Sequence, residues 1–287
     1  MRLTFHGVRG SCPCPCEENR RYGGNTACVV LDNPGAAGLD DDEPIVFDLG
    51  TGLRLWADRL TASGALDGGR RFAGTALVTH IHWDHVQGLP FFPPVHVAGA
   101  RLDVYGPHQE EGTLSGVIDG LMRPPYFPVM VSDLAGDIRF HDVTDESFAI
   151  GHNKVTVRPV PHVGPTVGYR VDTETGSVAY VSDHQAPADL ATVAPSVLDL
   201  CHGVDVLIHD AQYTLEEFRL KETWGHCTMD YALLVAQRAG AKRLVLFHHD
   251  PAHSDDVLDL VAVEMAAKGR AVGVEVIVAS EGLVLDV

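Results

Sequence analysis

Four side chains of the kinds that bind metal ions stand within six residues, in the run His80-Ile81-His82-Trp83-Asp84-His85. The apolar stretch 76–78 before it predicts a buried strand, so the four side chains lie on the turn that leaves this strand. A rigid scaffold can direct side chains on such a turn at one point. Two imidazoles followed by a carboxylate and a third imidazole suit two adjacent cations, and these donors suit zinc, manganese or iron. Such a dense cluster is hard to explain as chance.

Length and charge limit the classes of function. With 287 residues the chain can bury a sizeable core, and we predict a single domain over 1–287. The formal net charge of −18 argues against a large nucleic-acid footprint, because phosphate contacts need clustered Lys and Arg. Two bound divalent cations would still make the site locally positive. With no membrane-length apolar run and no secretory signal evident, we expect a cytoplasmic protein without membrane contact. The oligomeric state, including a homodimer, stays open.

The pattern of apolar residues favours a strand-rich α/β sandwich with helices outside. Apolar runs predict strands at 3–6, 27–31, 45–48, 76–79, 155–159, 167–171, 178–181, 204–209, 244–247, 274–278 and 283–287. Helical spacing and capping residues predict helices at 53–61, 114–122, 228–239 and 254–268. Residues 34–44 are Gly- and Asp-rich and predict an exposed hairpin loop.

Residues 88–150 are the least regular part of the sequence. Two Pro-rich pieces flank the predicted helix at 114–122, which is typical of a wall or lid beside an active site. We therefore predict an insertion over 88–150 that shapes the pocket, with a plain surface insertion as the equal alternative. Whether it moves as a lid is open, as is the role of the alternating Cys12, Cys14 and Cys16.

Further ligand candidates follow other predicted strands. His162, Asp183 and His248 each stand just beyond an apolar run, where loops at one edge of a sandwich converge. Asp48 also ends a strand and could fix the tautomer of a ligand imidazole, although a turn-forming role is the alternative. His226 precedes the helix capped by Thr228, a position that suits an anionic substrate. Its alternative role is structural, at the helix cap.

These residues together carry a family resemblance over nearly the whole chain. The chain resembles the metallo-β-lactamase-fold hydrolases of the phosphodiesterase and ribonuclease Z branch, and most closely the phosphonate-pathway cyclic phosphodiesterases. The matching motifs, in chain order, are Gly7-Val8-Arg9-Gly10-Ser11, Tyr22-Gly23-Gly24-Asn25-Thr26, Asp48-Leu49-Gly50-Thr51-Gly52, His80-x-His82-x-Asp84-His85, Pro161-His162-Val163-Gly164, Tyr180-Val181-Ser182-Asp183-His184, Trp224-Gly225-His226-Cys227-Thr228 and Leu244-Val245-Leu246-Phe247-His248.

The resemblance implies an αββα four-layer sandwich with two divalent metal ions at the sheet edge, zinc first and manganese or iron as alternatives. It implies one metal on His80, His82 and His162, a second on Asp84, His85 and His248, and Asp183 as the bridge. In the ribonuclease Z-like branch, the residue that matches His226 assists the leaving group or holds a phosphate oxygen.

The resemblance implies a phosphodiesterase, and two-metal chemistry gives the expected mechanism. Water shared by the metals loses a proton and attacks phosphorus, Asp84 orients this nucleophile, and His226 protonates or stabilises the leaving oxygen. The resemblance associates ribonuclease Z with a basic arm between the positions of His162 and Asp183. Only residues 163–182 separate them here, which favours a small or cyclic phosphodiester such as a cyclic nucleotide or cyclic ribose phosphate. The alternatives are a ribonuclease Z-like endoribonuclease, a lactone, thioester or β-lactam hydrolase, and a non-enzymatic metal-binding module.

Overall fold

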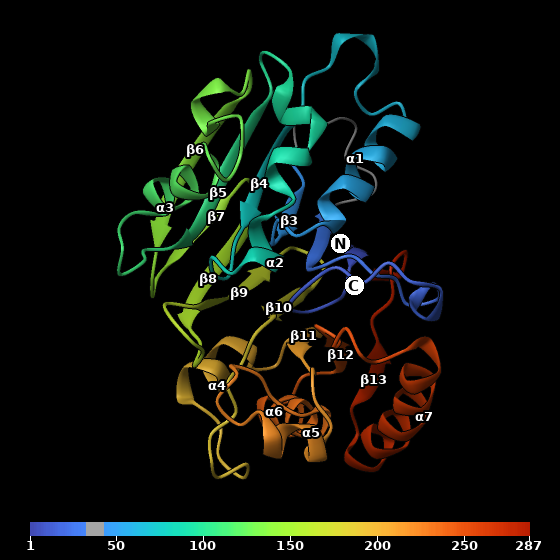
Figure 1. Ribbon diagram of the computed structural model, residues 1–287. Helices are drawn as coiled ribbons and strands as arrows, with labels where there is room; N and C mark the ends of the chain where they lie inside the picture. The colour runs from blue at the N-terminus through green and yellow to red at the C-terminus, as the bar shows by residue number, and fades with distance from the viewer. Residues whose placement is uncertain (33–42) are drawn as a thin grey trace.

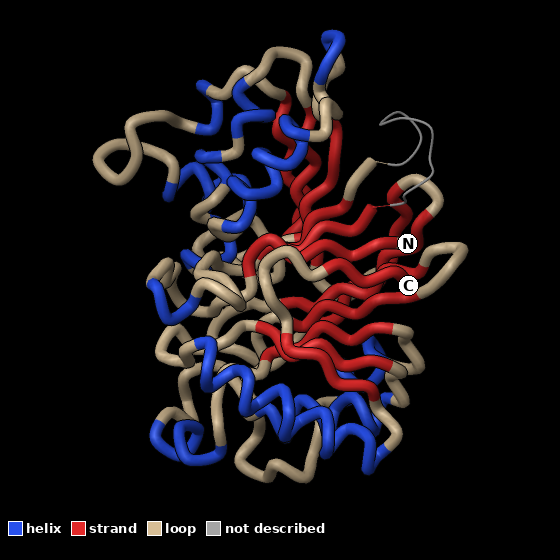
Figure 2. Tube along the Cα trace, turned by 90° about the vertical axis from the view of Figure 1, so that its right-hand side faces the viewer, coloured by secondary structure: helices blue, strands red, loops and turns tan. Residues whose placement is uncertain are grey.

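Two seven-stranded β-sheets pack face to face between outer layers of helices (Figures 1 and 2), in a computed structural model that describes residues 1–32 and 43–287. The predicted αββα sandwich is thereby confirmed. The first sheet has the order β14-β1-β2-β3-β4-β5-β6. Its strands are β1 (Arg2–Gly7), β2 (Cys28–Asp32), β3 (Ile45–Phe47), β4 (Ala73–Leu77), β5 (Arg101–Pro107), β6 (Asp137–Val143) and β14 (Val284–Asp286).

The second sheet has the order β13-β12-β11-β10-β9-β8-β7. Its strands are β7 (Ser147–Ile150), β8 (Asn153–Pro159), β9 (Val167–Asp172), β10 (Ser177–Val181), β11 (Val206–Asp210), β12 (Arg243–Phe247) and β13 (Glu275–Val278). Strands β3 to β6 run parallel to one another, as do β10 to β13. Carboxyl ends of parallel strands meet at one sheet edge, so the loops after them gather there.

The inner faces of the two sheets form a shared apolar core. Phe47 of the first sheet stacks on Tyr180 of the second with ring centroids 4.9 Å apart, and Phe5 lies 6.2 Å from Phe247. All four side chains are fully buried. Burying a side chain of this size contributes about 1.5–3 kcal/mol. This packing fixes the two sheets, and therefore their loop-bearing edges, relative to each other.

Helices cover both outer faces. On the first sheet α1 (Gly52–Ala62) packs on β1 and β2, and α3 (Leu114–Leu121) packs on β6. On the second sheet α4 (Pro195–Cys201), α6 (Met229–Ala239) and α7 (Asp255–Val272) pack on its strands. Two short helices, α2 (Trp83–Val86) and α5 (Leu215–Leu220), lie in connecting loops. None of the described helices combines the length and apolar character needed to cross a bilayer.

Capping chemistry sets the bounds of the long helices. The Thr228 hydroxyl accepts from the backbone N–H of Tyr231 at 3.0 Å, and Gly240 ends α6 in the left-handed conformation with φ 70°. These are the predicted ends, and both are confirmed. Helix α7 starts after Ser254 as predicted but extends to Val272, because the left-handed residue that ends it is Gly273.

Residues 88–150 hold more regular structure than their sequence predicts. Strands β5, β6 and β7 lie within this segment and extend both sheets. Alternating apolar residues, Leu102 and Val104 in β5 and Ile138 and Phe140 in β6, are the signal that could have indicated two of them. Within this segment, 88–100, 108–136 and the short turn 144–146 lie outside the strands. The hairpin predicted at 34–44 falls almost entirely on residues 33–42, outside the described part of the chain.

Candidate metal centre

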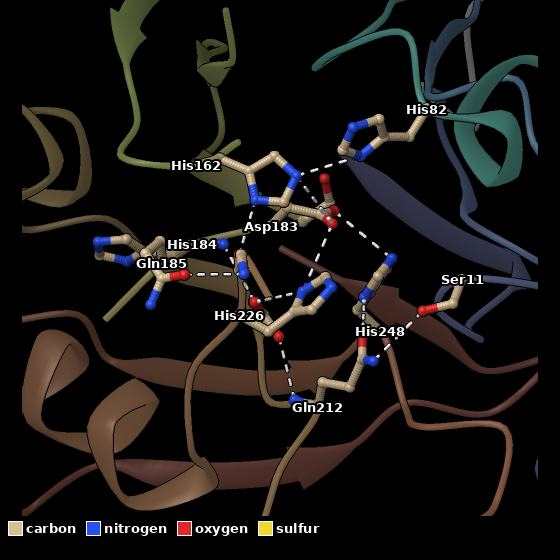
Figure 3. A network of polar contacts seen from close by, with 12 residues as sticks. Ser11, His82, His162, Asp183, His184, Gln185, Gln212, His226 and His248 are labelled. Carbon is tan, nitrogen blue, oxygen red and sulfur yellow. Dashed lines mark hydrogen bonds and ion pairs between the residues drawn. The ribbon is translucent and has the colours of Figure 1, made fainter. Parts of the chain in front are cut away.

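The seven predicted ligands come together at the edge where the parallel strands end. Three imidazoles form a first group, with Nε2 of His80 2.8 Å and Nε2 of His162 3.2 Å from Nδ1 of His82. His80 and His82 follow β4, whereas His162 follows β8 in the other sheet. Figure 3 shows His82, His162 and Asp183 directed toward one another. Three imidazole nitrogens at this spacing can hold one metal ion.

A second group lies beside the first. Oδ2 of Asp84 is 3.1 Å from Nε2 of His85 and 3.0 Å from Nε2 of His248. Asp84 and His85 belong to the short helix α2, and His248 follows β12. All three side chains are buried. One carboxylate oxygen and two imidazole nitrogens make a second set of potential ligands.

Asp183 lies between the two groups, directly after β10. Its Oδ1 faces the second group, 3.2 Å from Nε2 of His85 and 3.5 Å from Nε2 of His248. Its Oδ2 faces the first group, 4.0 Å from Nε2 of His80 and 3.9 Å from Nε2 of His162. Each carboxylate oxygen thus faces a different set of imidazoles, which is the arrangement that a bridging carboxylate requires.

Two atoms at the centre of the site indicate what fits there. Nε2 of His85 and Oδ1 of Asp183 are buried and have no hydrogen-bond partner among the described residues. Buried polar atoms of native proteins are nearly always satisfied, so an unpaired nitrogen and oxygen facing each other call for a further group. A divalent cation that accepts nitrogen and oxygen donors fits this position.

Hydrogen bonds orient four of the imidazoles from behind. Nδ1 of His85 lies 2.8 Å from Oδ2 of Asp48, Nδ1 of His248 lies 2.8 Å from Oε1 of Gln212, and Nδ1 of His162 lies 2.7 Å from the Gly225 carbonyl. Nδ1 of His80 is 3.1 Å from the Thr79 hydroxyl. In each ring Nδ1 is engaged, which directs Nε2 into the cluster.

Asp48 is fully buried and adopts φ 57° at the turn after β3. Besides facing His85, it accepts hydrogen bonds from the backbone N–H and hydroxyl of Thr79 and from the hydroxyl of Tyr180. Every bond of this carboxylate therefore holds a neighbouring part of the site in place.

The carboxylates favour positive charge in the site. Burial alone would lower the pKa of His85, but the carboxylates of Asp84, Asp183 and Asp48 raise it well above its usual range. Burial likewise opposes ionisation of Asp183, yet the imidazoles, led by His248 and His85, hold the pKa of this carboxyl well below its usual range. Ionised carboxylates are the state that binds metal ions.

His226 reaches the cluster from the turn before α6. Its Nδ1 is 3.1 Å from Oδ2 of Asp210 and 3.6 Å from Oδ2 of Asp183, and its ring stacks on His248 with centroids 5.1 Å apart (Figure 3). Burial acts to lower the pKa of His226, but the Asp210 carboxylate and its hydrogen bond raise it above the usual value.

Asp210 and Gln212 are site residues that sequence reasoning missed. Asp210 is fully buried at the end of β11 and also accepts from the backbone N–H groups of His184 and Gln212. The available signal was its place after an apolar strand, which is the same signal that indicated Asp183 and His248. Gln212 stands two residues beyond β11, but a glutamine amide is not a usual metal ligand, so sequence offers no comparable signal for it.

Two glycines let the backbone approach the imidazoles. A Cβ on Gly10 would lie 2.4 Å from Nδ1 of His248, and one on Gly225 would lie 2.3 Å from Cε1 of His162. Gly225 also has φ 93°, in the left-handed region. Next to Gly10, the backbone N–H of Ser11 donates to Oδ2 of Asp84 at 2.8 Å. Both glycine motifs thus serve close packing around the ligands.

Comparisons with known proteins agree with this geometry. The family model "Beta-lactamase superfamily domain" matches residues 45–249. A ribonuclease Z of Mycobacterium sp. (strain KMS) is 30% identical over 225 residues, which cover 72% of this chain and 74% of the relative.

Solved structures share the fold over the whole chain. A "New Diphosphatase from the PhnP Family" has a TM-score of 0.66 at 19% identity and covers 100% of this chain and 97% of its own. The Zn²⁺-bound PqqB of Methylobacterium extorquens has a TM-score of 0.71 at 17% identity, with 100% of both chains covered.

The fold and its site define a metal-dependent hydrolase of the metallo-β-lactamase type. The chain belongs to the β-lactamase superfamily, on the branch that includes the ribonuclease Z relative.

Proposed function

We propose that this protein is a phosphodiesterase that uses two divalent metal ions to hydrolyse a small or cyclic phosphodiester. The observation that carries the proposal is the position of Asp183, whose two oxygens face two separate sets of ligand atoms. Such paired metal sites are used by phosphatases and nucleases for displacement at phosphorus.

The two metal ions are assigned by the donors that surround each position. His80, His82, His162 and Oδ2 of Asp183 would hold one ion. Asp84, His85, His248 and Oδ1 of Asp183 would hold the other. Zinc is the ion that this mixture of imidazole and carboxylate suits first, and manganese and iron are the alternatives. When bound, the pair supplies Lewis-acid activation of water and neutralises charge at phosphorus.

Two side chains of the protein are assigned to proton movement. Asp84, held by the Ser11 backbone N–H, orients the attacking water by accepting a hydrogen bond from it. The Nδ1–H group of His226 donates a hydrogen bond to Asp210, so Nε2 is directed toward the substrate. In its imidazolium form, which the raised pKa of His226 favours, Nε2 also carries a proton and can protonate or hydrogen-bond the leaving oxygen. The nearby N-terminus of α6 adds partial positive charge for an anionic substrate.

The preference for a small substrate is supported by the connection between His162 and Asp183. Residues 167–181 of this connection are strands β9 and β10, joined by a tight turn at 173–176. The remaining residues between His162 and Asp183 are too few to form an additional arm that could contact RNA. The net charge of −18 also opposes a long phosphate-binding surface.

The test is a substrate panel on protein of measured metal content. We expect turnover of bis(p-nitrophenyl) phosphate and of a 2′,3′-cyclic nucleotide, with loss of both in His82→Ala. His152, an exposed residue in the turn between β7 and β8, provides the control His152→Ala, which should keep wild-type rates. Unchanged turnover in His82→Ala would overturn the ligand assignment, and turnover of a lactone or thioester alone would overturn the reaction class.

A ribonuclease Z-like endoribonuclease is the second candidate, and the relative of that name is the observation that favours it. Both candidates cleave phosphodiesters at the same metal centre and differ in substrate size. Efficient 3′ cleavage of precursor tRNA, with kcat/KM above that for cyclic nucleotides, would select this candidate instead.

A further inference from the structure

An aromatic cavity of about 150 Å³ is lined in part by α2, the helix that also carries the proposed ligands Asp84 and His85. Its lining residues come from α2 and the turn that follows it, and from α3 and the loop after that helix. Its aromatic walls are Trp83, Phe91, Tyr126 and Phe127. Most of its other lining residues are aliphatic, and among the described residues none that lines it is charged.

The short helix α2 joins the cavity to the metal centre. Asp84 and His85 face the ligand cluster, whereas Trp83, Val86 and Gln87 line the cavity. Trp83 stands between His82 and Asp84 in the chain, and both His82 and Trp83 are exposed. Trp83 is therefore the cavity residue that directly neighbours two proposed ligands in the chain. A substrate with phosphorus at the cluster can place an attached group against this ring.

The volume of the cavity and the chemistry of its lining residues limit which part of a substrate can fit into it. A cavity of this volume lined by apolar side chains holds a single aromatic ring such as benzene. Trp83, Phe91 and Tyr126 are 58%, 59% and 72% exposed, unusually high for large rings, and Phe91 and Phe127 meet edge to face at 5.8 Å. Gln87 supplies the amide of the lining, so one polar group can contact the edge of a heterocycle.

We propose that this cavity binds the nucleobase of the substrate, so that the enzyme acts on nucleoside phosphodiesters rather than on cyclic phosphates without a base. The inference rests on the proposed function and names its substrate class. A neutral cavity with stacking rings and one amide accepts an uncharged aromatic heterocycle. Aromatic side chains that stack on a base strengthen binding by about 5- to 150-fold per base.

The test compares two substrates that differ in the group on C1 of the ribose, 2′,3′-cyclic UMP with its single-ring base and 1-O-methylribose 2,3-cyclic phosphate without a base, followed by ³¹P NMR. Wild type should show a kcat/KM for the nucleotide at least about 5-fold higher, mostly through KM. Trp83→Ala and Tyr126→Ala should reduce this preference toward one, because the ratio of the two kcat/KM values cancels any effect that is common to both substrates. Trp83→Phe should retain part of it. Leu260→Ala, at an exposed apolar residue of α7, is the control.

Two further measurements separate this inference from the reaction itself. Titration with uridine should quench tryptophan fluorescence with saturation in wild type and in His82→Ala, but not in Trp83→Phe. If neither cyclic phosphate is hydrolysed while uridine binds, the proposed function fails and the base site stands. Equal kcat/KM for the two substrates, or absence of uridine binding, overturns the base site. Light scattering measures the oligomeric state of Trp83→Ala. If this state changes while the base preference stays intact, the cavity is a protein interface and the base site is overturned as well.

Discussion

Oδ2 of Asp48 lies 2.8 Å from Nδ1 of His85, and both side chains are fully buried beneath the ligand cluster. Because Asp48 also accepts from Thr79 and Tyr180, it cannot turn away from the imidazole without losing several hydrogen bonds. The contact fixes the proton on Nδ1 and presents Nε2 of His85 to the site. A carboxylate with no place in either proposed ligand set thus determines how one ligand is oriented.

Asp48→Asn tests this relationship. Asn tolerates the left-handed backbone at this position and keeps the size of the side chain, but it is a weaker acceptor for the His85 ring. We expect metal affinity to fall about 10- to 100-fold. Competition with a chelator measures the dissociation constant, with Asp172→Asn on β9 as the control. An affinity equal to that of the wild type would contradict the role assigned to Asp48.

Asp183→Asn removes one of the two oxygens that face the ligand groups. The amide keeps one oxygen for one group and presents a nitrogen with two hydrogens to the other. We expect the metal content to fall from two ions per chain toward one and kcat to fall by about 100-fold or more. Elemental analysis of the purified variant, together with its rate on a cyclic diester, measures both. Two ions per chain at wild-type rate would exclude a bridging role.

Asp210→Asn should affect the reaction more than metal binding. The variant weakens the hydrogen bond that orients His226, whereas Asp210 takes no part in either proposed ligand set. We expect kcat to fall about 10-fold or more at nearly unchanged KM and metal content. Loss of metal together with activity would show instead that Asp210 supports the cluster as a whole.

Gly225→Ala and Gly240→Ala form a matched pair. Both residues have positive φ, 93° and 70°, so alanine strains the backbone at each. Only at Gly225 would the new Cβ meet a ligand, His162, whereas no atom lies within 4 Å at Gly240. We expect Gly225→Ala to lose most activity and Gly240→Ala to lose about 1 kcal/mol of stability with normal kcat, because a Cβ is disfavoured in the left-handed region. Thermal melts and hydrolysis rates of both variants test this expectation. Equal rates for the two variants would contradict the steric role assigned to Gly225.

Acid should destabilise the protein in part through His6. Burial, assisted by the charge of Arg59, lowers the pKa of His6 from 6.5 to about 3 in the folded state. The unfolded chain therefore binds this proton first, so stability is complete above pH 6.5 and is lost as pH falls toward 3. The slope is at most about 1.4 kcal/mol per pH unit. His6→Gln, which does not titrate, should lose less stability than the wild type in urea melts between pH 7 and pH 5. Equal losses of stability in the variant and the wild type would contradict the role of His6.

Much of the site was predictable because its residues stand at strand ends. The run His80–His85 and the single residues His162, Asp183 and His248 each follow an apolar stretch, and apolar stretches can be read locally. The caps of α6 were predictable for a similar reason, because Thr228 and Gly240 act within one turn of the helix. In contrast, β5 to β7 escaped prediction. The alternation of apolar residues in β5 and β6 stands in a Pro-rich segment of irregular composition, and β7 is only four residues long.

By itself, the amino-acid sequence determined which side chains are available as metal ligands and that they lie on loops after strands. The tertiary structure alone decided that Asp183 directs one oxygen at each group, that Asp210 contacts His226, and that Trp83 borders an aromatic cavity. The physical reason is that the spacing of apolar residues along the chain determines which face of a strand is buried and where the strand ends. Distances between loops far apart in the chain depend instead on the register of both sheets and on the packing of Phe47 against Tyr180 between them.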